Sequence, residues 1–561
     1  MEKPWLKHYE PEVPPTLQYP ARPVHANLSE TAKKFPDATA TIFMDAKLTY
    51  AQLNALADRC AAALQQLGVK KGDRVGVYIA NSPQFVISYY GALRAGAIVV
   101  PFNPLYAAPE VEHQLQDSGA ETMLVMSRFY PNVKKVRSRT ALKRVIVTNI
   151  KEYFPSHLRV LFTLAKEKKE GDRQDISGDA NTYWLQDLLK NAPAQPTPVD
   201  VKPEDTAVLL YTGGTTGVPK GAELRHSNVM ANAVMCKAWV HDAQEGKEVS
   251  MTALPLYHSF GMTCCMNFSI YIGAAMLLIP NPRDLAGLLK QTQKHHPTLF
   301  AGVPTMYVAI NNFPDIAKYD LKSIRACISG AAGLPVEVQT RFQELTGGRL
   351  VEGFGLSEAS PVTHGNPIFG KNKIGTIGVP WPDTEAKIMD LETGAKEMPI
   401  GETGELVLRG PQVMKGYWNM PKETEIALRD GWLYTGDMAK MDEEGYFQIV
   451  DRKKDMIIAG GFNIYPREVE EALYQHPKVK EVVVAGIPDP YRGETVKAYV
   501  ILKQGETATA QEMIDFCKER IAKYKVPTAV EFRTELPKTI VGKILRRMLV
   551  EEEKKKQAQS K

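Results

Sequence analysis

Cysteine is scarce in this chain, with six among 561 residues. No two form a C-x-x-C pair, and no His/Cys cluster has the spacing of a zinc site. The pattern favours small apolar side chains in a reducing compartment, and a cytoplasmic protein is therefore expected. The cysteines are Cys60, Cys236, Cys264, Cys265, Cys327 and Cys517.

Long hydrophobic runs and a strong charge of one sign are also missing. "GAAMLLIP" is among the longest apolar runs, far short of a membrane span, and Pro280 ends it. The N-terminal "MEKPWLKHYEPEVPP" has no apolar core of the kind that secretory signals carry. A net charge of +5 is small for this length and gives no reason to expect a nucleic-acid partner.

Strand and helix patterns alternate through the first part of the chain. "TYAQLNALADRCAAALQQLG" has a helical apolar stripe that ends at Gly68. "DRVGVYIA", "AIVVPF", "VIVT" and "AVLLYT" are typical of short buried strands, and "QFVISYYGALRAG" separates two of them as a helix. This alternation predicts an α/β fold with layered parallel sheets.

The last hundred or so residues have a different pattern. Helical "PREVEEALYQHP" and "AQEMIDFCKERIAKYK" accompany the strand patterns "KEVVVAGIPD", "ETVKAYVIL" and "AVEFRTELP", which predicts a small α+β domain. A charged cluster followed by paired glycines precedes it. We therefore expect a large domain over residues 1–451 and a small one over 452–561. The charged tail "EEEKKKQAQSK" is expected to be frayed.

One loop has the composition of a phosphate-binding site. "YTGGTTGVPKGA", from Tyr211 to Ala222, combines glycines, hydroxyls and Lys220. It is not a P-loop, because Val218 and Pro219 separate Gly217 from the lysine. Backbone amides, hydroxyl donors and one cation are nevertheless the groups that hold phosphate, although a Gly/Thr surface loop is the alternative.

Five motifs in order give the chain a family resemblance. "YTGGTTGVPKG", "GFGLSE", "GWLYTGD", "DRKKDMI" and "PKTIVGKILRR" occur in the order typical of the acyl-adenylate-forming superfamily. Within it, the chain most resembles bacterial long-chain fatty-acid–CoA ligases. The resemblance implies a large adenylate-forming domain and a small mobile C-terminal domain. It also implies ATP, Mg²⁺ and coenzyme A: a fatty acid and ATP give acyl-AMP and pyrophosphate, and CoA then displaces AMP.

The resemblance assigns roles to residues of the large domain. The loop residues would grip the β- and γ-phosphates, Glu358 would hold Mg²⁺ with Thr215 as a second contact, and Ser357 would reach the α-phosphate. Phe354 and Gly330 would lie beside adenine. The complete set on this domain is Thr212, Gly213, Gly214, Thr215, Thr216, Gly217, Lys220, Gly330, Phe354, Gly355, Ser357 and Glu358.

Further roles fall later in the chain. Asp437 and Arg452 would bind the ribose, or would form only a salt bridge with each other. Lys543 matches the lysine that reaches the forming acyl-phosphate bond, which requires the small domain to swing, and Lys454 matches the hinge. Gly460 and Gly461 would line the pantetheine passage.

The acyl site is expected around His258, in "PLYHSFGMTCCMNF". The resemblance places a histidine at the floor of this site, although a lone histidine is as often structural. The absence of an acidic residue in this stretch favours an uncharged acyl chain. Met262 stands where some long-chain relatives carry an aromatic gate, so chain-length preference stays open. A medium-chain or aryl acid:CoA ligase, or a non-catalytic acyl or nucleotide sensor, is the alternative function.

Partners other than substrates are left open. "SHLRVLFTLAKEKK" places Leu158, Leu161, Phe162 and Ala165 on one helical face with basic residues around it. Such a helix fits the inner face of a membrane as a peripheral contact, or an ordinary protein surface. A homodimer is also open.

Overall fold

The computed structural model describes residues 3–212, 219–459, 462–489, 492–538 and 544–559. They divide into two compact units. The larger unit contains Trp5–Glu385 and Arg409–Leu433, and the smaller one contains Ala386–Leu408 and the chain from Tyr434 onward. The domain boundary expected after Asp451 stays a prediction. In the structure, Asp451 itself lies within the smaller unit.

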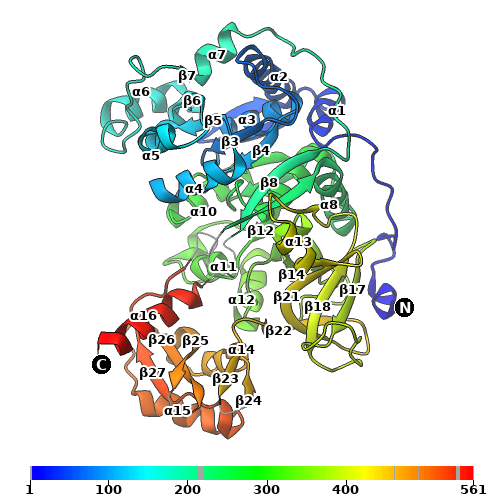
Figure 1. Cartoon of the computed structure of the whole chain (residues 1–561), viewed down its shortest axis with the longest axis vertical. Helices are drawn as coiled ribbons and strands as arrows, with labels where there is room; N and C mark the ends of the chain where they lie inside the picture. The colour runs from blue at the N-terminus through cyan, green and yellow to red at the C-terminus, as the bar shows by residue number, and fades with distance from the viewer. Residues whose placement is uncertain (1–2, 213–218, 460–461, 490–491, 539–543, 560–561) are drawn as a thin grey trace. The chain divides into compact units, whose positions relative to one another are not determined.

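The first sheet of the larger unit has the strand order β19-β9-β8-β4-β3-β5-β6-β7 (Figure 1). Pairing is parallel from β8 through β7, whereas β8 and β9 form an antiparallel hairpin and β19 pairs with β9. The strands are β3 (Arg74–Tyr78), β4 (Ile98–Pro101), β5 (Thr122–Met126), β6 (Arg144–Thr148), β7 (Thr182–Trp184), β8 (Thr206–Thr212), β9 (Lys220–Arg225) and β19 (Gly416–Tyr417).

Helices connect these strands, as parallel pairing requires. Val100, Met123 and Val145 from three of the strands are fully buried in one hydrophobic core. The helices of this region are α2 (Tyr50–Gln66), α3 (Pro83–Arg94), α4 (Ala108–Ser118), α5 (Tyr130–Val136), α6 (Ser156–Ala165), α7 (Leu185–Asn191) and α13 (Pro421–Ala427).

The second sheet of the larger unit has the order β16-β15-β14-β13-β12-β10-β11-β1-β2. Its core contains Met251, Phe300 and Leu350. The strands are β1 (Thr39–Phe43), β2 (Ala46–Thr49), β10 (Val249–Thr252), β11 (Ala275–Leu278), β12 (Leu299–Gly302), β13 (Ala326–Ser329), β14 (Arg349–Gly355), β15 (Val362–Gly365) and β16 (Val379–Pro380). The helices are α1 (Ala26–Lys34), α8 (His226–Trp239), α9 (Phe268–Ile272), α10 (Leu285–His295), α11 (Pro304–Asn311) and α12 (Val336–Thr346).

Two further sheets follow in the chain. In the third, β18 lies between β17 and β21, β22 pairs with β21, and β20 pairs with the first residues of β21. The fourth has the order β24-β23-β26-β25, with β27 against β26. The strands are β17 (Glu385–Met389), β18 (Gly404–Arg409), β20 (Leu428–Arg429), β21 (Trp432–Met441), β22 (Phe447–Arg452), β23 (Ile457–Ala459), β24 (Phe462–Ile464), β25 (Val479–Asp489), β26 (Gly493–Leu502) and β27 (Ala529–Phe532). The helices are α14 (Pro466–Tyr474), α15 (Ala510–Lys518) and α16 (Arg546–Gln559).

The predicted α/β layers and the α+β C-terminal part are both confirmed. Helix α2 begins after Thr49, whose hydroxyl accepts from the Gln52 amide in a capping box, and ends before Gly68. The expectation of a frayed tail is wrong. Residues 551–559 continue α16, where Glu553 is buried and its carboxylate lies 2.9 Å from Lys497 Nζ.

Candidate functional site

The β8–β9 hairpin carries the predicted phosphate loop. Thr212 ends β8 and Lys220 begins β9, and the two residues pair across the hairpin. The predicted loop residues Gly213, Gly214, Thr215, Thr216 and Gly217 lie outside the described residues.

Lys220 lies against groups that come from a distant part of the chain. Its ammonium pairs with the Glu423 carboxylate of α13 and stands 5.2 Å from the ring centroid of Tyr417. Tyr417 reaches this place because β19 pairs with β9, with Tyr417 opposite Ala222. A cation over an aromatic face gains from the ring's negative potential. The lysine ammonium is therefore held by an acid and a ring beside the base of the hairpin.

Glu358 belongs to the same cluster. It follows β14, in a short 3₁₀ turn over Ser357–Ala359, and its carboxylate accepts a hydrogen bond of 2.8 Å from the Tyr417 hydroxyl. Burial, and next the Glu358 charge, raise the pKa of Tyr417 well above its ordinary value. The phenol thus stays protonated and donates to Glu358 at physiological pH. Tyr417 joins the two predicted charged residues, Lys220 and Glu358.

The donor chemistry here fits Mg²⁺ carried by a phosphate ligand. In the described ranges, no three His, Cys, Asp or Glu side chains gather as a metal site. Mg²⁺ keeps several waters and takes one or two carboxylates together with substrate phosphates. Glu358, with one oxygen engaged by Tyr417, offers such a single carboxylate.

The neighbouring predicted residues surround the end of β14. Ser357 Oγ lies 3.2 Å from Ser259 Oγ. Phe354 stands edge-on to His364 at 6.1 Å, and burial lowers the pKa of His364 to about 3, so this ring is neutral. A Cβ at Gly355 would lie 2.3 Å from the Pro361 carbonyl oxygen, which explains the glycine.

Gly330 follows β13 and is packed by Phe260. A Cβ on this residue would meet the Phe260 ring at 3.0 Å. Its amide donates to the Gly302 carbonyl at 3.1 Å. The backbone here is therefore held against a ring with little space for a side chain.

His258 lies at the start of an unusual helix. Its Nδ1 accepts a hydrogen bond of 3.3 Å from the Phe260 amide. Residues Gly261–Asn267 form a π-helix, a rare form that is frequent at functional sites. A Cβ on Gly261 would lie 2.2 Å from the Pro255 carbonyl oxygen. Met262 is fully buried within this segment.

The smaller unit contains the other predicted residues. Asp437 in β21 and Arg452 in β22 pair across the strands, with Arg452 Nε 3.0 Å from Asp437 Oδ1. Asp437 is buried, whereas Lys454 is exposed. Gly460, Gly461 and Lys543 lie outside the described residues, although Lys538 and Ile544, on either side of 539–543, form an antiparallel bridge.

Sequence reasoning missed four residues of these clusters. Tyr417, Glu423 and Ser259 contact predicted residues only through tertiary packing. Tyr417 and Glu423 lie in no motif that the sequence singled out, whereas Ser259 lies in the expected acyl-site stretch but was given no role there. Arg546, which lies in the last of the five motifs but was given no role, forms ion pairs with Asp451, Asp455 and Glu470. The three acids raise the pKa of Arg546 above its ordinary value, although burial alone would lower it.

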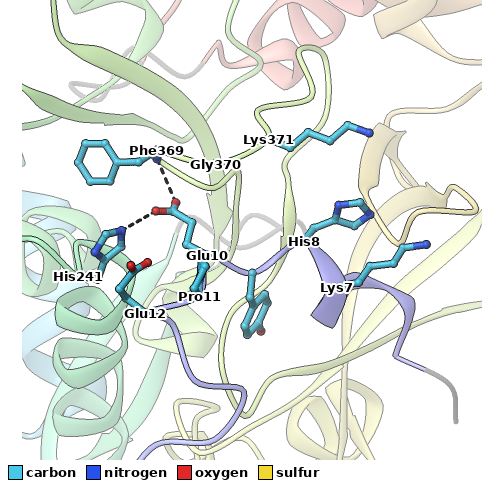
Figure 2. Close-up of a pocket in the computed structure, with 10 residues that line it drawn as sticks. Lys7, His8, Glu10, Pro11, Glu12, His241, Phe369, Gly370 and Lys371 are labelled. Carbon is cyan, nitrogen blue, oxygen red and sulfur yellow. Dashed lines mark hydrogen bonds and ion pairs between the residues drawn. The ribbon is translucent and has the colours of Figure 1, made fainter.

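A separate cavity of about 410 Å³ opens at the N-terminal segment. Figure 2 shows Glu10 between His241, whose Nε2 is 2.5 Å from its carboxylate, and the Phe369 amide, which donates at 3.0 Å. None of the predicted site residues lines this cavity.

Among the described helices, none has both the length and the apolar content that a membrane span requires.

Known proteins resemble the chain over nearly its whole length. The profile described as AMP-binding enzyme matches residues 28–418, and that of the AMP-binding enzyme C-terminal domain matches 468–543. A "Long-chain-fatty-acid--CoA ligase" of Bacillus subtilis (strain 168) is 50% identical over 98% of each chain, and one of Yersinia pestis is 41% identical over 99% of each. The crystal structure of the anthranilate CoA ligase AuaEII with anthranoyl-AMP has a TM-score of 0.85 at 29% identity, covering 97% of this chain and 99% of that one. The chain therefore belongs to the AMP-binding enzyme family.

Proposed function

We propose that the protein is an ATP- and Mg²⁺-dependent long-chain fatty acid:CoA ligase. The observation that carries the substrate class is 50% identity, over 98% of both chains, to a protein named for that activity. The chemistry has independent support from the cluster of Lys220, Tyr417 and Glu358 beside the β8–β9 hairpin.

The reaction has two displacements. A carboxylate oxygen of the fatty acid attacks the α-phosphorus of ATP, the bond to the bridging oxygen breaks, and pyrophosphate leaves. The CoA sulfur then attacks the acyl carbonyl carbon, and AMP leaves with the oxygen that came from the acid. Bound Mg²⁺ supplies charge neutralisation on the phosphates.

The larger unit contributes the phosphate-binding groups in this proposal. Lys220 exchanges Glu423 for the β- and γ-phosphates, assisted by Thr212 and by the loop from Gly213 to Gly217. Glu358, oriented by Tyr417, holds Mg²⁺ together with Thr215. Ser357 donates to the α-phosphate, and Phe354, Gly355 and Gly330 form the adenine side of the site.

The C-terminal part completes the site by moving. Asp437 and Arg452, already paired with each other, present a carboxylate and a guanidinium to the ribose. Lys543 stabilises the charge that develops during acyl transfer to the α-phosphate. The part after Asp451 turns about Lys454 between the two half-reactions, and Gly460 and Gly461 line the passage of the CoA thiol.

The acyl chain binds near His258 and the π-helix in this proposal. Met262 and Cys265 of that helix are fully buried and uncharged, which suits an apolar chain. An aryl acid is the second candidate substrate, because the fold also matches a ligase for anthranilate.

Peripheral membrane contact and a homodimer belong to the proposal as well. Sedimentation velocity measures whether the protein is a homodimer.

CoA-dependent AMP formation tests the proposal directly. The purified chain is assayed with ATP, Mg²⁺, CoA and acids from about six to about eighteen carbons, with benzoate and anthranilate alongside. Each buried methylene contributes up to ~0.8 kcal/mol, so kcat/KM should rise steeply with length. A preference for acids below about twelve carbons, or for aryl acids, would exclude the long-chain assignment. If no acid leads to AMP formation, the result would favour the alternative function, a non-catalytic acyl or nucleotide sensor.

A further inference from the structure

The 3₁₀ turn that carries Glu358 is held at both of its ends by one other segment of the chain. At its start, Ser259 Oγ lies 3.2 Å from Ser357 Oγ. At its end, the Thr263 hydroxyl donates to the Ser360 carbonyl at 2.6 Å. Ser360 has a φ of 72°, a left-handed conformation that a serine keeps only where its surroundings impose it. Glu358 therefore stands between two residues that the same segment fixes.

Both hydroxyls come from the segment expected to line the acyl site. Ser259 follows His258 directly, and Thr263 lies in the π-helix. The two residues are four positions apart in a helical stretch, so they lie on one face and reach the same turn. Between them in the chain, the Phe260 ring packs against Gly330. One short stretch thus contacts the Glu358 turn twice and the adenine side of the proposed site once.

Burial leaves these hydroxyls little choice of partner. Ser259 is 1% exposed, and Thr263 and Ser360 are fully buried. A buried polar group without a hydrogen bond is costly, so the contact between Thr263 and the Ser360 carbonyl is expected to persist. The Ser360 hydroxyl in turn donates to the Gln412 carbonyl at 2.9 Å. The end of the Glu358 turn is therefore fixed from two directions.

The contact between the two serines restricts where their protons point. Either hydroxyl can donate to the other in the free protein. A hydroxyl has only one proton to donate, and in the proposed site Ser357 gives its proton to the α-phosphate. The contact then requires Ser259 to donate to Ser357 Oγ. Ser259 would thereby keep the Ser357 proton directed at the phosphate.

We propose that Ser259 and Thr263 are positioning residues that hold Ser357 and Glu358 in place for the α-phosphate and Mg²⁺. Neither touches the nucleotide, because each acts through its contact on the turn. The segment after His258 then serves the acyl site and also fixes the residues that bind the metal and the phosphate. This inference rests on the proposed function, which supplies the nucleotide and the metal.

Mg²⁺-dependent binding of α,β-methylene-ATP tests the proposal without any turnover. Thr263→Val keeps the size of the side chain but removes its hydroxyl, and calorimetry should show binding weakened roughly fivefold. Thr263→Ser restores the donor and should bind the analogue as the parent does. Ser259→Ala should weaken binding by a similar factor, because Ser357 loses the group that orients it.

Thr292→Val is the matched control. Thr292 is fully buried, and its hydroxyl donates to the Leu288 carbonyl within α10 at 2.9 Å. The control therefore loses the same kind of hydrogen bond far from the turn in sequence, and it should bind the analogue as the parent does even if its Tm falls. An equal loss of binding in Thr292→Val, or unchanged binding in both Thr263→Val and Ser259→Ala, would overturn the proposal.

Kinetics separate a role on the Glu358 turn from a role in the acyl site. In the ligase assay, Thr263→Val should raise the KM for ATP and the Mg²⁺ requirement while the KM for the fatty acid stays near that of the parent. A rise confined to the KM for the fatty acid would overturn the proposal. A parent protein that bound the analogue with Mg²⁺ but formed no AMP would contradict the proposed function, and the binding comparison among the variants would still decide the role of Ser259 and Thr263.

Discussion

Lys220 is held by an acid from another part of the chain. Its ammonium pairs with Glu423, a half-buried residue on α13, while the Tyr417 ring lies beneath it. A triphosphate entering the hairpin would have to displace this carboxylate. In the proposed site, Glu423 would therefore keep the lysine in place and would also compete with the nucleotide for it.

Replacing the acid should strengthen nucleotide binding. Glu423→Gln removes the competing charge, and an ion pair of this exposure contributes ~0.2–1 kcal/mol. We expect the KM for ATP to fall up to about fivefold in pyrophosphate exchange. Glu425→Gln, at an exposed position of the same helix, is the control and should leave the KM for ATP unchanged. Lys220→Met should reduce kcat/KM by roughly 10²–10³. Weaker ATP binding in Glu423→Gln would show that the acid only positions the lysine.

Tyr417 offers a second test at this scale. Tyr417→Phe keeps the ring beneath Lys220 but removes the hydroxyl that donates to Glu358. Hydrogen bonds to charged groups contribute about 1.5–3 kcal/mol, so at least a roughly tenfold higher Mg²⁺ concentration should be needed for half-maximal exchange. The pKa of Tyr417 is raised, so the hydroxyl should not titrate below about pH 10. An unaltered Mg²⁺ requirement would exclude Tyr417 as the residue that orients Glu358.

Motif residues could be predicted from the sequence, but their contacts could not. Lys220 and Glu358 stand in recognisable stretches, and their residue types point to phosphate and metal chemistry. Tyr417 enters the cluster because β19 pairs with β9, a long-range contact that no local pattern records. Ser259 meets Ser357 in the same way.

Helix α16 is held by an ionic cluster at its outer half. Glu531 of β27 lies 2.7 Å from Lys497 and 3.2 Å from Lys556, and Lys497 also pairs with Glu553. Burial acts to raise the pKa of Glu531, but hydrogen bonds from Lys497 and Lys556 outweigh it and lower the pKa to about 2. A charged tail thereby becomes an ordered helix, which its composition alone did not indicate.

Acid should loosen this helix. Because the folded-state pKa of Glu531 lies below its unfolded value, its contribution to stability is present above about pH 4.5 and is lost as the pH falls toward about 2. Glu531→Gln should cost ~1 kcal/mol of unfolding free energy at neutral pH, since solvent screens the cluster. Urea titrations should show this difference shrinking in acid. Glu506→Gln, at an exposed site, should have the same free energy of unfolding as the parent at every pH. A difference in unfolding free energy for Glu531→Gln that persisted at about pH 2 would contradict the assignment.

Regular elements followed from periodicity, whereas irregular ones did not. Helix α2 was visible from its apolar stripe and Gly68, and β3 and β4 from their short apolar runs. The π-helix over Gly261–Asn267 has no period that sequence reasoning tests for. Its sequence signal is Gly261, whose Cβ would collide with the Pro255 carbonyl oxygen.

The whole molecule divides its predicted chemistry between two units. Lys220, Ser357 and Glu358 belong to the larger unit, and Asp437 and Arg452 to the smaller one. Strand–helix alternation predicted the parallel sheets because parallel neighbours need crossover helices. The order of strands within each sheet depends on long-range pairing, and the sequence could not supply it.

The origin of the oxygen in AMP tests the central claim most directly. If the fatty-acid carboxylate attacks the α-phosphorus of ATP, one of its two oxygens must leave with AMP when CoA takes the acyl group. With acid labelled by ¹⁸O in both carboxylate positions, mass spectrometry should find one labelled oxygen in each AMP and the other in the thioester. Label in inorganic phosphate, or AMP without label, would contradict an acyl-adenylate route.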